Sequence, residues 1–151
     1  MALDRGLIGT ETVGETMSVS RSRLRFFAKA TGQEDPVYVD LAAAKQAGHR
    51  DLPVPPTFFT AIDLEHPDPF RWLQTIGIDL RSILHGEQEF KFHRMAYAGD
   101  ELTTRSRVTD IYEKRGGALE FLVRTTTVTN QDGEVVAEAV STTVIRQLNL
   151  T

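Results

Sequence analysis

The chain has 151 residues, of which 40% are hydrophobic and 25% are charged, so it has the size and composition of one globular domain with a buried core. A net charge of −4 with scattered Lys and Arg residues gives no broad basic surface for nucleic acid. The absence of cysteine excludes a disulfide scaffold, a thiolate metal site and a cysteine nucleophile.

The N-terminal residues carry no targeting pattern. Residues 1–9 include Asp4 and Arg5 and have no long apolar run, so we expect neither a secretory signal nor a transit peptide. No stretch approaches the roughly 18 apolar residues of a membrane helix. We therefore expect a cytoplasmic protein without a membrane segment.

The first half of the chain, to about residue 79, predicts helices separated by prolines. Ser20 is a good N-cap, apolar residues follow at i, i+3 and i+4, and Gly32 ends the helix. A second helix is predicted from Asp40, as N-cap, to Gly48.

A third segment, Thr57–Leu64, is apolar nearly all round, as expected of a helix that is buried on several sides. Pro56 can occupy its first turn. Residues 66–69 break this helix, and a short turn or helix is expected from Phe70 to Ile76.

From Ser82 onward the hydrophobic period changes to two, which predicts strands. Turns are predicted at 98–100, 115–117 and 130–133. The predicted strands cover residues 82–93, 102–113, 118–129 and 134–146.

These elements predict an α+β fold in which helices cover one face of an antiparallel sheet. One apolar helix beside long alternating strands favours the hot-dog architecture, in which a curved sheet wraps around a central helix. We expect a single hot-dog domain over residues 1–151, with Thr57–Leu64 as the central helix.

The tract at 26–40, with Gly32, Pro36 and Asp40, resembles the signature of MaoC-like (R)-specific enoyl-CoA hydratases. The Pro-rich tract at 53–58 resembles the loop that enters the central helix of that family, and Ala98-Gly99-Asp100 resembles a turn that follows its next strand. The resemblance spans about residues 10–146. It implies a lyase of fatty acid metabolism that interconverts 2-enoyl and 3-hydroxyacyl thioesters of coenzyme A or acyl carrier protein.

The chain departs from this signature at the catalytic pair, which is an Asp directly after the Gly and a His five residues later. Aligned on Pro36, those positions hold Gln33 and Tyr38. A glutamine has no titratable proton, and a tyrosine with an unperturbed pKa of about 10 is a poor base at neutral pH.

In this respect the chain looks more like the N-terminal-type MaoC dehydratases, in which a degenerate domain pairs with a second hot-dog domain that brings the Asp and the His. The stretch Leu84–Phe90, followed by His93 and Arg94, also resembles an element of those proteins. The resemblance implies a homodimer, or a heterodimer with a second hot-dog chain.

For the acid and base of the reaction, His85 with Glu87 is the His/carboxylate pair that we nominate. Strand alternation predicts that both lie on one face, and Gly86 between them permits a bulge. Asp35 is a second candidate for the orienting carboxylate. The alternatives are that His85 bonds a backbone carbonyl or contacts a partner.

Four residues are candidates for substrate binding. Thr57 and Phe58 would start the central helix and offer N–H groups to the thioester oxygen. Tyr38 either packs in the space of the missing His or orients the substrate, and Arg94 either pairs with acids or reaches a coenzyme phosphate. Because no His spacing fits a zinc site and no Gly-rich phosphate loop occurs, we expect no metal and no cofactor.

Two functions follow. One is an acyl-thioester hydratase or dehydratase that acts alone through His85 or as one subunit of a pair. The other is a non-catalytic acyl-binding subunit that shapes the substrate tunnel for a partner. A hot-dog thioesterase is a third and weaker alternative.

Overall fold

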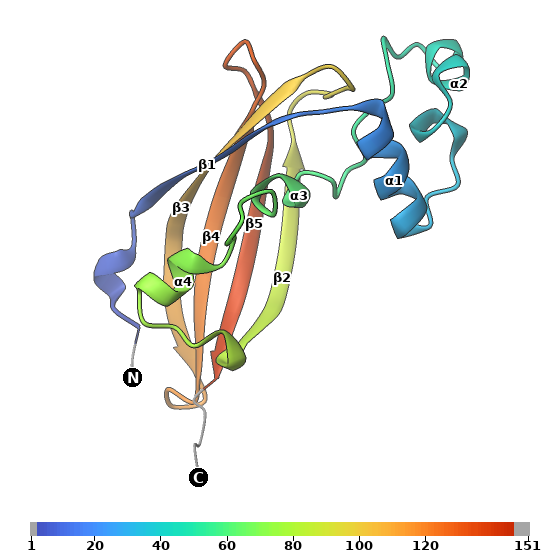
Figure 1. Ribbon diagram of the computed structural model, residues 1–151. Helices are drawn as coiled ribbons and strands as arrows, with labels where there is room; N and C mark the ends of the chain where they lie inside the picture. Colours follow the sequence, from blue (N-terminus) through green and yellow to red (C-terminus); the bar gives the residue numbers. More distant parts are fainter. Residues whose placement is uncertain (1–2, 147–151) are drawn as a thin grey trace.

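The computed structural model describes residues 3–146, which form one five-stranded antiparallel sheet with helical segments around it (Figure 1). The strand order is β1-β3-β4-β5-β2, so β1 and β2 are the two edges. The strands are β1 Glu11–Ser18, β2 Ile83–Phe92, β3 Glu101–Lys114, β4 Leu119–Thr129 and β5 Val135–Arg146. Each predicted strand is therefore confirmed to within about two residues, and the order is that of a hot-dog sheet.

The helices precede the long strands, as the sequence predicted. They are α1 Arg21–Thr31, α2 Leu41–Gln46, α3 Thr60–Asp63 and α4 Arg71–Thr75, with short 3-10 turns η1 Arg5–Leu7, η2 Pro36–Tyr38 and η3 Leu80–Ser82. The side chain of Ser20 accepts a hydrogen bond from the Arg23 N–H, and Gly32 ends α1 with φ 69°. Asp40 caps α2 by accepting from the Ala42 N–H at 2.8 Å. The first two predicted helices are confirmed.

The central segment is buried as predicted, but its helix is shorter than predicted. Phe58 and Ile62 are 1% and 0% exposed, whereas only Thr60–Asp63 is α-helical. The Phe58 N–H donates to the Pro55 carbonyl at 2.9 Å, which is a turn and not an α-helical bond. Residues 64–70 are turns and bends, because the prolines at 67 and 69 lack the N–H groups that a continuing helix would need.

The apolar core has two parts. The upper cluster joins α1 and the central segment to the ends of the sheet near the turn at 98–100, and the lower cluster lies beneath α4. Large side chains of the upper cluster are Leu24, Phe58, Ile62, Leu102 and Val128; those of the lower cluster are Leu73, Ile78, Val108, Ile111 and Leu122. Polar side chains of β3 and β4, among them Thr104 and Ser106, lie between the two clusters along these strands.

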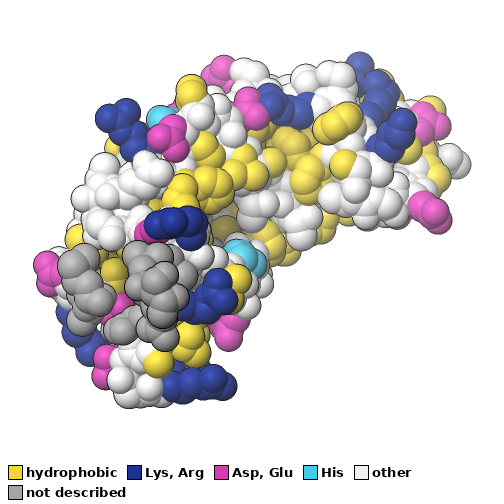
Figure 2. Space-filling view, turned by 60° about the horizontal axis from the view of Figure 1, so that its bottom comes forward, with side chains coloured by type: hydrophobic (Ala, Val, Ile, Leu, Met, Phe, Trp, Pro, Cys, Tyr) yellow, Lys and Arg dark blue, Asp and Glu magenta, His cyan; other side chains and the backbone are white. Residues whose placement is uncertain are grey.

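Figure 1 shows α3 and α4 in front of one face of the sheet, while α1 and α2 extend beyond one end of it. In the space-filling view, apolar side chains reach the surface in a band along the middle of the elongated molecule (Figure 2). No helix among residues 3–146 is long and apolar enough to cross a membrane.

Candidate functional site

The two positions that hold the catalytic pair in the resembled signature lie in the segment between α1 and α2. The side chain of Gln33 accepts a hydrogen bond from the Asp35 N–H at 3.1 Å. Asp35 in turn accepts from the Val37 N–H at 3.0 Å and caps η2. Tyr38 is half-buried at the end of η2. Gln33 and Asp35 therefore shape a local turn, and no hydrogen bond or ion pair joins either side chain to a titratable side chain among residues 3–146.

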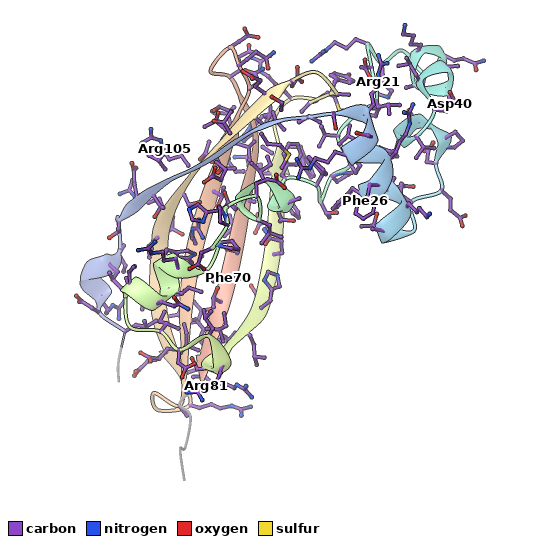
Figure 3. All side chains as sticks on the ribbon, viewed as in Figure 1. Arg21, Phe26, Asp40, Phe70, Arg81 and Arg105 are labelled. Carbon is purple, nitrogen blue, oxygen red and sulfur yellow. The ribbon has the colours of Figure 1, made fainter. Side chains whose placement is uncertain are left out.

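The predicted carboxylate Asp35 and the predicted base His85 are at different ends of the molecule. Asp40, which follows Asp35 closely in the chain, is labelled on the protruding helical segment in Figure 3. Arg81, which precedes His85 closely, is labelled at the opposite end of the sheet. The structure does not bring Asp35 and His85 together.

His85 and Glu87 lie on the edge strand β2, with a β-bulge between them. His85 pairs with Thr143 and Glu87 pairs with Thr142, so the two side chains leave opposite faces of the sheet. The prediction that they share one face is wrong, because the bulge at Gly86 shifts the alternation by one residue. The side chain of His85 lies on the same face of the sheet as that of Ile83, and Ile83 packs against the lower core cluster.

Two of the predicted substrate-binding groups already have partners within the chain. The Phe58 N–H donates to the Pro55 carbonyl, and Arg94 Nη2 lies 3.3 Å from Glu134 Oε1. Thr57 is exposed in the turn before α3, and its carbonyl accepts from the Thr60 hydroxyl at 2.9 Å. The helix start expected at Thr57 and Phe58 lies instead at Thr60.

A cleft of about 360 Å³ lies between β1 and the α3–α4 segment. Its lining includes Asp63 of α3, Trp72 of α4 and Arg124 of β4, together with Gly14 and Glu15 of β1. This volume is within the range of small-molecule sites, which is roughly 300–1,000 Å³. It is therefore a candidate binding site.

Arg124 is the central polar group of this cleft. Its Nη2 donates to Ser106 Oγ at 2.7 Å and lies 3.5 Å from Asp63 Oδ2, and its guanidinium stacks 4.5 Å from the centre of the Trp72 ring. Burial lowers the pKa of Arg124, and the nearby charge of Asp63 opposes this shift. Arginine is nevertheless charged at any physiological pH. A mostly buried cation, with a side chain that is 16% exposed and one long ion-pair contact, thus lines the cleft.

Asp63 joins this cation to the sheet. Its Oδ1 accepts a hydrogen bond from the Thr104 hydroxyl at 2.5 Å, while its Oδ2 faces Arg124. Sequence reasoning missed this cluster, because Asp63 and Arg124 are 61 positions apart in the chain. The one feature of the sequence that pointed to this cluster is the position of Arg124, which lies on the same face of its strand as the buried Leu122.

No group of three or more His, Asp or Glu side chains within residues 3–146 is arranged to hold a metal ion. The candidate site is therefore described by hydrogen-bonding, charged and aromatic groups alone.

Comparison with known proteins agrees with this architecture. Residues 6–139 match the family described as "FAS1-like, dehydratase domain region". A UPF0336 protein from Parafrankia sp. is 40% identical, covering 97% of this chain and 96% of that protein.

Two solved structures are similar over most of the chain. One is the C-terminally truncated HadBC (3R-hydroxyacyl-ACP dehydratase) complex from Mycobacterium tuberculosis, with 26% identity, a TM-score of 0.78, and coverage of 95% of this chain and 99% of that chain. The other is a MaoC-like dehydratase, with 25% identity and a TM-score of 0.81. The match covers 95% of this chain and 43% of that chain. The chain belongs to the FAS1-like dehydratase-region family and to the UPF0336 proteins, with the hot-dog fold of the MaoC-like dehydratases.

Proposed function

We propose that this chain is the acyl-binding subunit of a two-chain hydratase/dehydratase that acts on thioesters of coenzyme A or acyl carrier protein. The observation that carries the proposal is the pair Gln33 and Tyr38 at the positions of the catalytic Asp and His. Gln33 bonds its own turn, so no acid–base pair replaces the missing one there.

The chemistry explains why a partner is needed. Hydration of a 2-enoyl thioester requires a base for water, an acid for the α-carbon and N–H donors for the thioester oxygen. This chain supplies a cleft of suitable volume and a sheet edge, whereas the partner supplies the Asp/His pair. The similarity to one chain of the HadBC complex supports this division of labour.

The edge strand β2 is the proposed contact with the second hot-dog chain. Leu84 and Phe92 on this strand are 48% and 52% exposed, and the outer hydrogen-bonding edge of β2 has no neighbouring strand within the described chain. Open strand edges of this kind are normally covered in native proteins. Pairing of two sheets through β2 would cover both the edge and the apolar side chains.

A second candidate function is a hydratase that acts unaided through His85. It is favoured by the position of His85 beside the bulge, on the sheet face of Ile83. Glu87 leaves the other face, so this candidate requires another carboxylate to orient the imidazole. Tyr38, Thr57, Phe58 and Arg94 stay proposed contacts to the substrate in both cases.

The test is hydration of crotonyl-CoA and of longer 2-enoyl thioesters by the purified chain, with its association state measured by light scattering. We expect a dimer and no hydration by the chain alone, with hydration restored by a hot-dog partner that carries the Asp/His pair. A monomer at micromolar concentration that gains no activity with such a partner would reject the proposal. Hydration by the chain alone, lost in His85→Ala, would establish the second candidate.

A further inference from the structure

The cleft between β1 and the α3–α4 segment has more hydrogen-bonding capacity than the fold uses. Of the three nitrogen atoms of the Arg124 guanidinium, only Nη2 has hydrogen-bond partners among residues 3–146. These partners are Ser106 and Asp63. No buried side-chain nitrogen or oxygen in this part of the chain lacks a partner. The Nε and Nη1 groups of Arg124 are therefore accessible, and Arg124 is a lining residue of the cleft.

Asp63 presents an acceptor beside these donors. Its side chain is 29% exposed, and its only contact with Arg124 is long, at 3.5 Å. The second oxygen is held by the Thr104 hydroxyl at 2.5 Å, so the carboxylate cannot turn away from the cleft without losing that bond. A spare N–H donor and a carboxylate acceptor thus lie side by side on the cleft floor.

The charge around the cleft disfavours an anionic ligand. The lining contains the acids Glu15, Asp63 and Asp68, the arginines Arg71 and Arg124, and His66, whose Nε2 lies 4.0 Å from Glu15 Oε1, so the cleft has no excess of positive charge. A carboxylate brought to Arg124 would also face Asp63. A neutral group that both accepts and donates a hydrogen bond fits the pair better, and a hydroxyl is the simplest such group.

The remainder of the lining favours an apolar ligand body. Pro69 and Trp72 contribute apolar surface to the same cleft, and the Trp72 ring covers one side of the guanidinium. A polar floor with apolar walls suits a hydrocarbon chain with one polar group on it.

We propose that the cleft binds a hydroxyl group carried on an otherwise apolar acyl chain, with Arg124 donating to its oxygen and Asp63 accepting its hydrogen. This inference rests on the proposed function and names its substrate class. Because the reacting carbons next to the thioester lie at the partner's Asp/His pair, the recognised hydroxyl is remote from the thioester. The subunit thereby selects hydroxylated acyl chains over unsubstituted acyl chains of the same length.

The alternative role of the pair is purely structural, since Asp63 ties α3 to β3 through Thr104 and to β4 through Arg124. That role accounts for Nη2 of Arg124 but not for its two accessible groups, Nε and Nη1. It predicts effects on stability alone, so ligand selectivity separates the two roles.

The experiment compares plain and ω-hydroxylated acyl N-acetylcysteamine thioesters in matched pairs of increasing chain length. Trp72 is the only tryptophan of the chain and lines the cleft, so its fluorescence reports binding directly. Calorimetry gives the same ratio of affinities for the chain with its partner. At the length that reaches Arg124, the hydroxylated ligand is expected to bind about tenfold more tightly, as one hydrogen bond to a charged group allows.

Arg124→Met removes the donors and keeps much of the side-chain volume, so the ratio should fall to about 1. Asp63→Asn keeps the shape of the side chain and removes its charge, so it should lower the ratio of the two affinities. This variant replaces Arg124→Met in the test if Arg124→Met does not fold. Arg105→Met is the matched control, because Arg105 pairs with Glu11 on the other face of the sheet, away from the cleft, and its loss should leave the ratio unchanged.

Equal affinity of the wild-type chain for the plain and hydroxylated members of every pair would overturn this inference and leave the proposed function standing. An unchanged ratio in folded Arg124→Met would also overturn it. Failure of all thioesters to bind, with and without the partner, would instead overturn the proposed function and this inference together.

Discussion

A Cβ atom at Gly14 would lie 1.9 Å from Thr104 Oγ1 and 3.0 Å from Asp63 Oδ1. Gly14 sits where β1 bulges between Val13 and Thr16, and this bulge brings the backbone against the polar floor of the cleft. The Glu15 N–H donates to the same Thr104 hydroxyl at 3.2 Å. The close approach of strand and cleft therefore requires glycine at this position.

Gly14→Ala should lower the free energy of unfolding by about 1–3 kcal/mol, the usual cost of overpacking. Urea denaturation of the variant measures this loss. Because the clash is with the Thr104 hydroxyl, Thr104→Ala in the Gly14→Ala background should cost less than Thr104→Ala alone. Additive costs in this double-mutant cycle would show that the backbone is free to move at Gly14.

Phe58 anchors the upper core cluster and packs edge-on against Phe27, with ring centres 5.2 Å apart. Phe58→Ala should destabilise the protein by about 3–5 kcal/mol, because it removes a fully buried ring. Phe26→Ala is the matched control: Phe26 is 73% exposed on the neighbouring position of α1, and its loss should change stability by about 0.5 kcal/mol or less. Similar losses in the two variants would contradict the burial of the central segment.

The pair of Arg21 and Asp51 predicts a stability change in acid. Arg21 Nε and Nη2 donate to the two Asp51 oxygens at 2.9 and 2.7 Å, which lowers the pKa of Asp51 from 3.8 to about 2. Because the folded-state pKa lies below the unfolded value, the pair stabilises the fold above pH 3.8, and this contribution disappears as the pH falls toward about 2.

The difference in stability between the wild type and Asp51→Asn should therefore shrink between pH 4.5 and pH 2.5, as measured by thermal unfolding. In an Arg21→Met background, which lacks the partner, the effect of Asp51→Asn should be small and nearly independent of pH. A wild-type advantage that stays constant down to pH 2.5 would argue against this pair as its source.

The helices and strands were predictable where the signal is local. Ser20, Gly32 and Asp40 fix helix ends through hydrogen bonds or backbone angles that involve neighbouring residues only. The long strands follow from side-chain alternation, which also depends on neighbours. The shortening of the central helix was harder to predict from the sequence. The segment has the apolar composition of a buried helix, but the Phe58 N–H donates to the Pro55 carbonyl in a turn.

The site was predictable only in part, since its geometry depends on contacts between distant segments. The bulge at Gly86 puts His85 and Glu87 on opposite faces, although simple alternation puts them on one. The cluster of Asp63, Trp72 and Arg124 comes from α3, α4 and β4, and no spacing in the sequence reports their contact. The loss of the Asp/His pair, by contrast, is visible in the sequence alone.

His85→Ala separates the two candidate functions. If the chain is an acyl-binding subunit, activity of the reconstituted pair should change by less than about threefold, because the acid and base belong to the partner. If the chain acts unaided, the variant should lose about 10²–10⁴-fold in rate, as expected for a general acid–base group. The comparison is meaningful only when the melting temperature and the association state match the wild type.

Hydration by the chain mixed with a hot-dog partner that carries the Asp/His pair, repeated with that Asp and His replaced, tests directly whether the acid and base belong to the partner. We predict no hydration by the chain alone, hydration by the mixture, and none by the mixture with the dyad-deficient partner. Gln33→Asp with Tyr38→His in this chain would test whether the same segment can regain the chemistry. Hydration that persists in the mixture after the partner's Asp/His pair is removed would contradict the role of an acyl-binding subunit, because it would place the acid and base in this chain.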